Sequence, residues 1–313
     1  MTGRSEETQR AYEDRVRCLL GAASRAAGRS SGQVGVQELV QYLLDYREEW
    51  SPSTWRQYKA AVLSVFRGTG SEEDENALDQ LHQTAQPTKL ETRCTSAQRQ
   101  KSLPPADMAS LVGRLRRRRS RYAAPLMTYF VAAGVTGLRP GEWPGAAWDE
   151  TSQTLIVRNA KHDDQRAHGP TRTIDLSDQS TEILAMVEAW LGWVAGECRQ
   201  GTYASSMEAM QKLLYRVSRA LWPARETYPM LYSTRHQSVA NWKRASLSQE
   251  VMAALLGHAS DRTASEHYGR RAAGAKGLRP GDTNLAPPRA SSEEIQRVRT
   301  RARPAPRPAS PEP

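Results

Sequence analysis

The sequence predicts a mostly α-helical protein with a small antiparallel β-hairpin, divided into two domains. Apolar residues recur at helical spacing through most of the 313 residues. Residues 154–177 differ, because two alternating, β-branched runs flank a polar turn, which is typical of a hairpin. The basic segment 86–104 has no apolar periodicity and separates two stretches that are each long enough for a hydrophobic core, so it is predicted to be a linker.

The first domain, residues 1–85, is predicted to be a small helical bundle. A helix is expected to begin where Ser51 can cap it and Pro52 can take the first helical position. Acidic residues open the segment 71–83 and favour a further short helix through the helix dipole. Three apolar helix faces are formed by Tyr12, Val16, Leu19, Leu20 and Ala23, by Val36, Leu39, Val40, Leu43 and Leu44, and by Trp55, Tyr58, Val62, Val65 and Phe66.

The second domain, residues 105–276, is predicted to be larger and to contain the hairpin. It begins with two helices separated near Ser120, and after the hairpin helical segments follow at 179–199, 205–222, 236–246 and 249–258. The remaining residues, 277–313, are rich in Pro, Arg, Ala and Ser. They are predicted to be disordered, except for a short helix at 291–302.

The composition narrows the class of partner. The net charge is +10 and arginine supplies most of it, which favours a polyanion whose phosphate groups match the guanidinium fork. Three scattered cysteines, Cys18, Cys94 and Cys198, indicate reduced thiols and lack metal-ligand spacing, so no metal and no cofactor are expected. Neither a membrane-spanning apolar run nor a signal peptide is recognisable, and a cytoplasmic location without membrane association is predicted.

Four separated stretches carry groups suited to phosphate chemistry. Each has an ordinary structural alternative when taken singly: an Arg–Glu pair inside the fold, a solvent-facing lysine beside a turn, or a half-buried tyrosine at the end of an amphipathic helix. The stretches contain Arg139 and Glu142 in TGLRPGE, Lys161 after the first hairpin run, Arg235 and His236 in YSTRH, and His258 with Tyr268 in LGHASDRTASEHY.

Together, in this order and spacing, these stretches resemble the motifs of the tyrosine recombinases, also called the phage integrase family. Residues 136–142 match the family's T-G-L-R-x-x-E, and Lys161 stands where the family has a hairpin lysine. Residues 232–236 correspond to H-x-x-R-H, and 256–258 to the L-G-H that precedes the nucleophilic tyrosine, here Tyr268. The resemblance is specific over about 103–275 and looser over 6–85.

Two departures from the family pattern stand out. Tyr232 occupies the first position of the H-x-x-R-H motif, and a phenol is a poor base at neutral pH. The general base is therefore left without an assignment. Ten residues separate His258 from Tyr268, one more than the family pattern leads us to expect.

The resemblance implies a mechanism and a role for each residue. Tyr268 would attack a DNA phosphodiester and form a 3′-phosphotyrosine, while Lys161 protonates the leaving 5′-oxygen. Arg139 and Arg235 would bind the non-bridging oxygens of the phosphate. His258 and Tyr232 would hydrogen-bond to the same phosphate. Glu142 would orient an arginine, and His236 would likewise contact these residues without contacting the phosphate.

The implied function is site-specific recombination that integrates or excises a mobile element. The resemblance implies double-stranded DNA as substrate, a homotetramer in the synaptic complex, and DNA-bending accessory proteins as possible partners. The domain at 1–85 would clamp DNA, 86–104 would link it to the catalytic domain at 105–276, and 277–313 would form the tail. The alternatives are a catalytically silent DNA-binding relative, a type IB topoisomerase that relaxes supercoils, and a helical transcription regulator.

Overall fold

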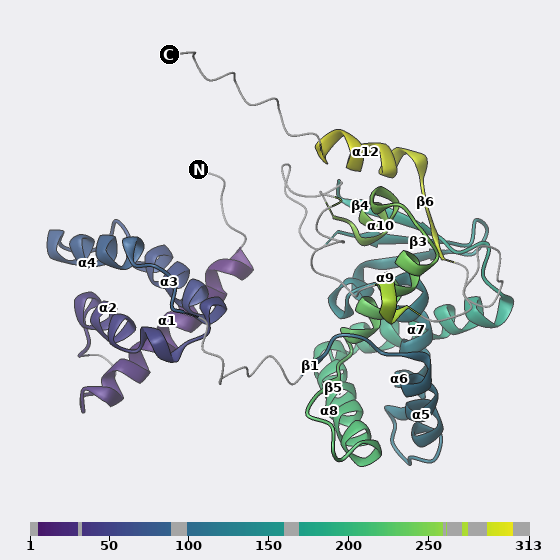
Figure 1. Cartoon of the computed structure of the whole chain (residues 1–313), viewed down its shortest axis with the longest axis horizontal. Helices are drawn as coiled ribbons and strands as arrows, with labels where there is room; N and C mark the ends of the chain where they lie inside the picture. Colours follow the sequence, from purple (N-terminus) through teal and green to yellow (C-terminus); the bar gives the residue numbers. More distant parts are fainter. Residues whose placement is uncertain are drawn as a thin grey trace. The chain divides into compact units, whose positions relative to one another are not determined.

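The computed structural model describes residues 6–30, 33–88, 99–159, 169–258, 261, 271–274 and 287–302 (Figure 1). The chain divides into two compact units, Met1–Ser96 and Ala97–Pro313. The described residues are mostly helical with a small antiparallel sheet, which confirms the predicted fold class. No described helix combines the length and the apolar character needed to cross a membrane.

The N-terminal unit is a helical bundle around one core. Ser51 accepts a hydrogen bond from the backbone N–H of Thr54, so the third α-helix begins at Pro52 as the sequence predicts. Trp55 is completely buried beneath Trp50, and the two rings stack. The elements are α1 (Glu6–Ala26), α2 (Val36–Asp45), the short 3-10 helix η1 (Arg47–Glu49), α3 (Pro52–Phe66) and α4 (Glu72–Gln83).

The C-terminal unit packs helices around a four-stranded antiparallel sheet of order β2-β3-β4-β6. Its helices are α5 (Pro105–Leu115), α6 (Ala123–Thr136), η2 (Pro140–Gly145), α7 (Thr181–Arg199), α8 (Tyr203–Leu221), α9 (Ser233–Arg244), α10 (Gln249–Leu256), η3 (Arg271–Ala273) and α12 (Ser292–Ala302). Its strands are β1 (Arg99–Gln100), β2 (Ala146–Asp149), β3 (Thr154–Arg158), β4 (Thr171–Asp175), β5 (Tyr228–Pro229) and β6 (Arg289–Ala290).

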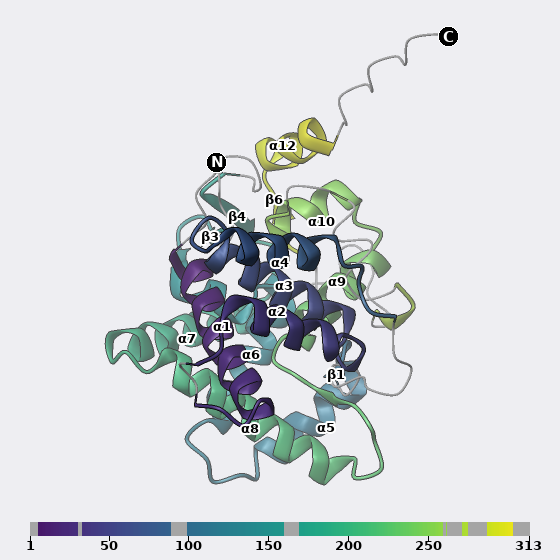
Figure 2. The ribbon, with the colours of Figure 1, turned by 90° about the vertical axis from the view of Figure 1, so that its left-hand side faces the viewer.

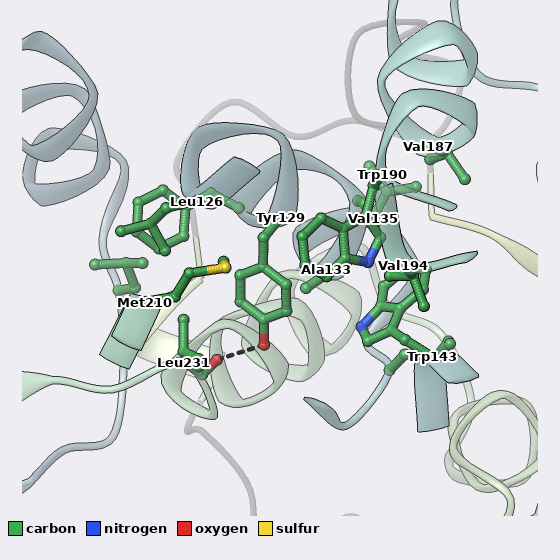
Figure 3. Close-up of a cluster of buried hydrophobic side chains, with 14 of the residues drawn as sticks. Leu126, Tyr129, Ala133, Val135, Trp143, Val187, Trp190, Val194, Met210 and Leu231 are labelled. Atoms are coloured by element: carbon green, nitrogen blue, oxygen red, sulfur yellow. Dashed lines mark hydrogen bonds between the residues drawn. The ribbon is translucent and has the colours of Figure 1, made fainter. Parts of the chain in front are cut away.

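The apolar helix α6 lies in the core of this unit and packs against α7 and α9. Tyr129 of α6 contacts the Trp190 ring edge-on and donates a hydrogen bond of 2.9 Å to the Leu231 carbonyl (Figure 3). Ser238 of α9 donates to the Gly134 carbonyl at 2.8 Å, close to the end of α6. These contacts fix the end of α6 against the first turns of α9, which brings the TGLR and YSTRH motifs together.

The predicted linker ends earlier than expected. Residues 99–100 form β1, which pairs in parallel with β5, and Leu103 is buried in the core of the C-terminal unit. The backbone N–H of Leu103 also donates to the Gln237 side chain at 3.0 Å. The last residues of the predicted linker therefore belong to the C-terminal unit. A two-residue strand is too short to show a periodic side-chain pattern, so this pairing is not predictable from residues 99–100 alone.

Within the predicted tail, the short helix expected at 291–302 is present as α12, whereas the prediction of disorder is wrong for residues 289–290, which form β6. β6 adds a strand to the sheet beside β4, and α12 packs on α10, where Val298 is buried against Ala253 and Ala254. Figures 1 and 2 place β6 and α12 at the same end of the unit as β4 and α10, while α5 and α8 form the opposite end. Ile295 and Val298 supply the short apolar face of α12.

Val298→Ala is expected to lower the free energy of unfolding by about 2 kcal/mol, because it removes buried methyl groups and leaves a cavity. The exposed Gln296 on the same helix provides the control, and Gln296→Ala is expected to change stability little. Urea unfolding followed by circular dichroism measures both. Equal stability of the two variants would contradict the packing of α12 on α10.

Candidate active site

Arg139 is presented by a turn that only glycine permits. α6 ends at Gly137, whose backbone is left-handed with φ of 66°. A Cβ at this position would lie 2.6 Å from the Trp242 ring, so a side chain is excluded by space as well as by conformation. The buried Leu138 then anchors the chain, and Arg139 follows with 27% of its side chain exposed.

Glu142 holds Arg139 in place through two contacts. The backbone N–H of Arg139 donates to one carboxylate oxygen at 2.8 Å, and its guanidinium donates to the other at 2.7 Å. The Tyr203 hydroxyl donates to the Pro140 carbonyl at 2.5 Å and fixes the same turn from α8. Glu142 itself is only 1% exposed, so the turn hides the carboxylate and leaves part of the arginine accessible.

Arg235 lies in the first turn of α9 and is fully buried. Its guanidinium donates to the carbonyls of Gly137 at 2.7 Å and Leu256 at 3.1 Å, and lies 3.4 Å from Glu142. Both carbonyls belong to helix ends, which carry unsatisfied acceptors and partial negative charge. Arg235 thereby joins the ends of α6 and α10.

His258 follows Gly257, the residue that caps the C-terminus of α10. Its Nε2 lies 3.3 Å from an Nη2 of Arg139 and 3.3 Å from an Nη2 of Arg235. Since a guanidinium can only donate, Nε2 is the acceptor in both contacts. Two arginine side chains from separate segments therefore converge on one point beside the histidine ring.

Arg172 is a member of this site that the sequence did not single out. Arg172 lies on β4 and its side chain is 1% exposed. Its guanidinium donates a hydrogen bond of 3.0 Å to the Glu142 carboxylate. It also donates to the Asn159 side chain at 2.6 Å and to the Leu255 carbonyl at 2.9 Å. The sequence does contain a sign of it. Side chains alternate between the two faces of a strand, so Arg172 lies on the same, inward face of β4 as the buried Ile174.

The cluster carries an excess of positive charge. Burial raises the pKa of Glu142, but the guanidiniums of Arg172, Arg235 and Arg139 outweigh it and hold the pKa below its ordinary value. Glu142 is thus a carboxylate that compensates one of three guanidinium charges. A site of this charge and fork geometry is suited to bind a phosphate group.

Tyr232 is the N-cap residue of α9, and His236 lies in the first turn of the helix beside Arg235. The Tyr232 ring is half-buried and contacts the His236 ring edge-on at 5.4 Å between centroids. Burial, together with the positive charges of Lys101, Arg235 and Lys243, lowers the pKa of His236 to about 4. His236 is therefore neutral at pH 7 and adds no charge to the cluster.

The structure brings together Arg139, Glu142, Arg235 and His258 from the predicted set. Lys161 and Tyr268 lie outside the described residues, so their assignments stay predictions. Within the described ranges, no group of three or more His, Cys, Asp or Glu side chains has an arrangement that could hold a metal ion.

Comparison with solved structures identifies the fold. A lambda integrase tetramer bound to a Holliday junction superposes with a TM-score of 0.52 and 17% identity over 86% of this chain and 74% of that one. A lambda integrase dimer bound to a COC′ core site gives a TM-score of 0.51 and 18% identity over 86% and 73% of the two chains. The chain has the tyrosine recombinase fold.

The likeness lies in the fold rather than in the overall sequence. No protein-family model matches the chain. No curated protein matches it either. Within the tyrosine recombinase fold, the TGLR turn, the first turn of α9 and the end of α10 converge on a single positively charged site.

Glu142→Gln is expected to lower the free energy of unfolding at pH 7 by about 3–5 kcal/mol, because it leaves buried guanidiniums without their counter-charge. The folded-state pKa of Glu142 is lowered, so its stabilisation is present above its ordinary pKa of 4.5 and is lost as the pH falls through the folded-state value. The stability difference between wild type and variant should therefore shrink below about pH 4.

Urea unfolding at a series of pH values measures this difference. Glu226→Gln changes an exposed carboxylate of the same unit and serves as the control, with little expected effect at any pH. A Glu142→Gln difference that stays constant down to pH 3 would show that the carboxylate charge is not what stabilises the cluster.

Proposed function

We propose that this chain is a site-specific DNA recombinase that cleaves and rejoins duplex DNA through a 3′-phosphotyrosine. The observation that carries the proposal is the convergence of Arg139 and Arg235 on His258 around a buried carboxylate. The match of TGLRPGE, YSTRH and LGH to the motifs of the family supports it, since these motifs supply the converging residues.

In the proposed reaction the two arginines act on the phosphate. Their Nη2 groups bind the non-bridging oxygens, whose negative charge grows in the pentavalent transition state. Arg235 is held by two carbonyls and Arg139 by Glu142, so both donors are oriented before the substrate arrives. Once the two Nη2 groups turn from the His258 ring to the phosphate, Nε2 no longer has to accept, and the imidazole with its proton on Nε2 donates to the same phosphate.

The bond-making groups are Tyr268 and Lys161, assigned from the resemblance. The Tyr268 oxygen bonds to phosphorus and the P–O5′ bond breaks, while Lys161 gives a proton to the leaving 5′-oxygen. The excess positive charge of the cluster favours the phenolate form, and its proton passes to water. Attack by the 5′-hydroxyl of a partner duplex on the phosphotyrosine reverses these steps and joins the exchanged strands.

The wider role follows from the same proposal. The N-terminal bundle and the C-terminal unit bind double-stranded DNA together, and recombination of a mobile element takes place in a homotetramer with DNA-bending proteins as further partners. A tetramer of lambda integrase bound to a Holliday junction, which shares the fold, supports this assembly. The exposed arginines that dominate the net charge of +10 suit binding to the DNA backbone.

A suicide DNA substrate tests the proposal, with a nick beside the cleavage position and the end sequence of the encoding element. Wild type is expected to form a covalent protein–DNA adduct that denaturing gel electrophoresis resolves. Tyr268→Phe should form none, and Arg235→Ala should slow its formation by about 10²–10³-fold. Tyr215→Phe changes an exposed tyrosine of the same unit and should leave the adduct unchanged.

Each alternative gives a different result in this assay. A catalytically silent relative binds the substrate and yields no adduct with wild type. A topoisomerase forms the adduct and relaxes plasmids that lack the element ends, whereas a recombinase requires these ends and joins two duplexes. An adduct that persists in Tyr268→Phe would overturn the nucleophile assignment.

A further inference from the structure

Arg172 is the point at which three segments of the site meet. One guanidinium donates from Nη2 to Glu142, from Nη1 to Asn159 and from Nε to the Leu255 carbonyl, at 3.0, 2.6 and 2.9 Å. Its side chain is 1% exposed, so none of these donors is shared with bulk water. A single rigid guanidinium thus joins three segments of the chain, through two side chains and one main-chain carbonyl.

Each of these segments carries or adjoins a residue of the proposed reaction. Glu142 orients Arg139, and Leu255 stands three residues before His258 at the end of α10. Asn159 closes the base of the hairpin, because its backbone N–H donates to the Pro170 carbonyl and its side chain to the Gly169 carbonyl, both at 2.9 Å.

Gly257 shows how closely the fork is enclosed. Its φ of 65° is left-handed, and a Cβ would lie 2.5 Å from the Asn159 side-chain oxygen and 3.0 Å from Nη1 of Arg172. The glycine of the L-G-H motif therefore leaves room for the Arg172–Asn159 contact. The chain passes directly from this contact to His258.

Stability alone does not account for a buried arginine in this strand. Moving a guanidinium out of water is unfavourable, and an apolar side chain of similar size would fill the same place at least as well. Ile174 occupies the next inward position of the strand and shows that the site tolerates an apolar residue one step away. The fork is distinguished by its three directed donors, which a lysine ammonium cannot reproduce.

We propose that Arg172 is a positioning residue of the cleavage reaction: its guanidinium sets Glu142, the base of the hairpin and the end of α10 in the arrangement that the reaction requires. This inference rests on the proposed function. Arg172 touches neither the phosphate nor the reacting atoms, and acts on them through Arg139 and His258.

The experiment compares Arg172→Lys with wild type in three measurements: the affinity for the intact DNA site, the single-turnover rate of adduct formation on the suicide substrate, and the melting temperature. Arg172→Lys keeps the charge and removes the fork. The expected result is a cleavage rate at least tenfold lower per folded molecule, with DNA affinity within about twofold of wild type.

Val187→Ala is the matched control, because it removes a fully buried apolar contact on α7 and lowers the melting temperature without touching the cluster. Its cleavage rate per folded molecule should equal that of wild type. Equal rates for Arg172→Lys and Val187→Ala would overturn the inference, since loss of stability would then explain any effect.

Asn159→Ala provides a second test if Arg172→Lys fails to fold. It removes one of the three acceptors and leaves those of Glu142 and Leu255, so a several-fold loss of cleavage rate at unchanged DNA affinity is expected; an unchanged rate would overturn the inference. The absence of an adduct with wild type would overturn the proposed function, and the inference with it.

Discussion

The candidate site of the C-terminal unit depends on the contacts between the buried Glu142 carboxylate and three arginine side chains. The carboxylate is 1% exposed and lies among the guanidiniums of Arg139, Arg172 and Arg235, which come from a turn, a strand and a helix. Without it, three cations would repel one another in a region of low dielectric constant. With it, the same cations are held close enough to act on one anion, and an excess of positive charge remains for that purpose.

The fork of each arginine is used differently. Arg235 donates to the carbonyls of Gly137 and Leu256. Arg172 donates to the Leu255 carbonyl and to Glu142. Two successive carbonyls at the end of α10 are therefore satisfied by two different arginines. Arg139 is the most exposed of the three arginines, so a ligand from solution meets it first, and the Nη2 group of Arg235 lies beside it at the same nitrogen of His258.

Local signals in the sequence were sufficient for the helices and for part of the site. Ser51 and Pro52 marked the start of α3 because capping involves neighbouring residues, and the TGLRPGE motif located Arg139 and Glu142 within one turn. The pairing of β1 with β5 and of β4 with β6 could not be predicted, since it joins main-chain groups far apart in the sequence. Arg172 was missed for a related reason: its three partners are all distant along the chain.

Because the contacts of the cluster join residues far apart in the sequence, they form late in folding. Arg139 and His258 are 119 positions apart, and Arg172 and Leu255 are 83 apart, so these contacts close long loops and form only as the unit reaches its final topology. A chain that ends between α9 and α10 contains the TGLR turn and the first turn of α9, but it lacks His258 and the carbonyls of α10 and cannot complete the cluster. The convergence of Arg139 and Arg235 on His258 is thus a property of the finished fold, and a chain that ends before α10 lacks it.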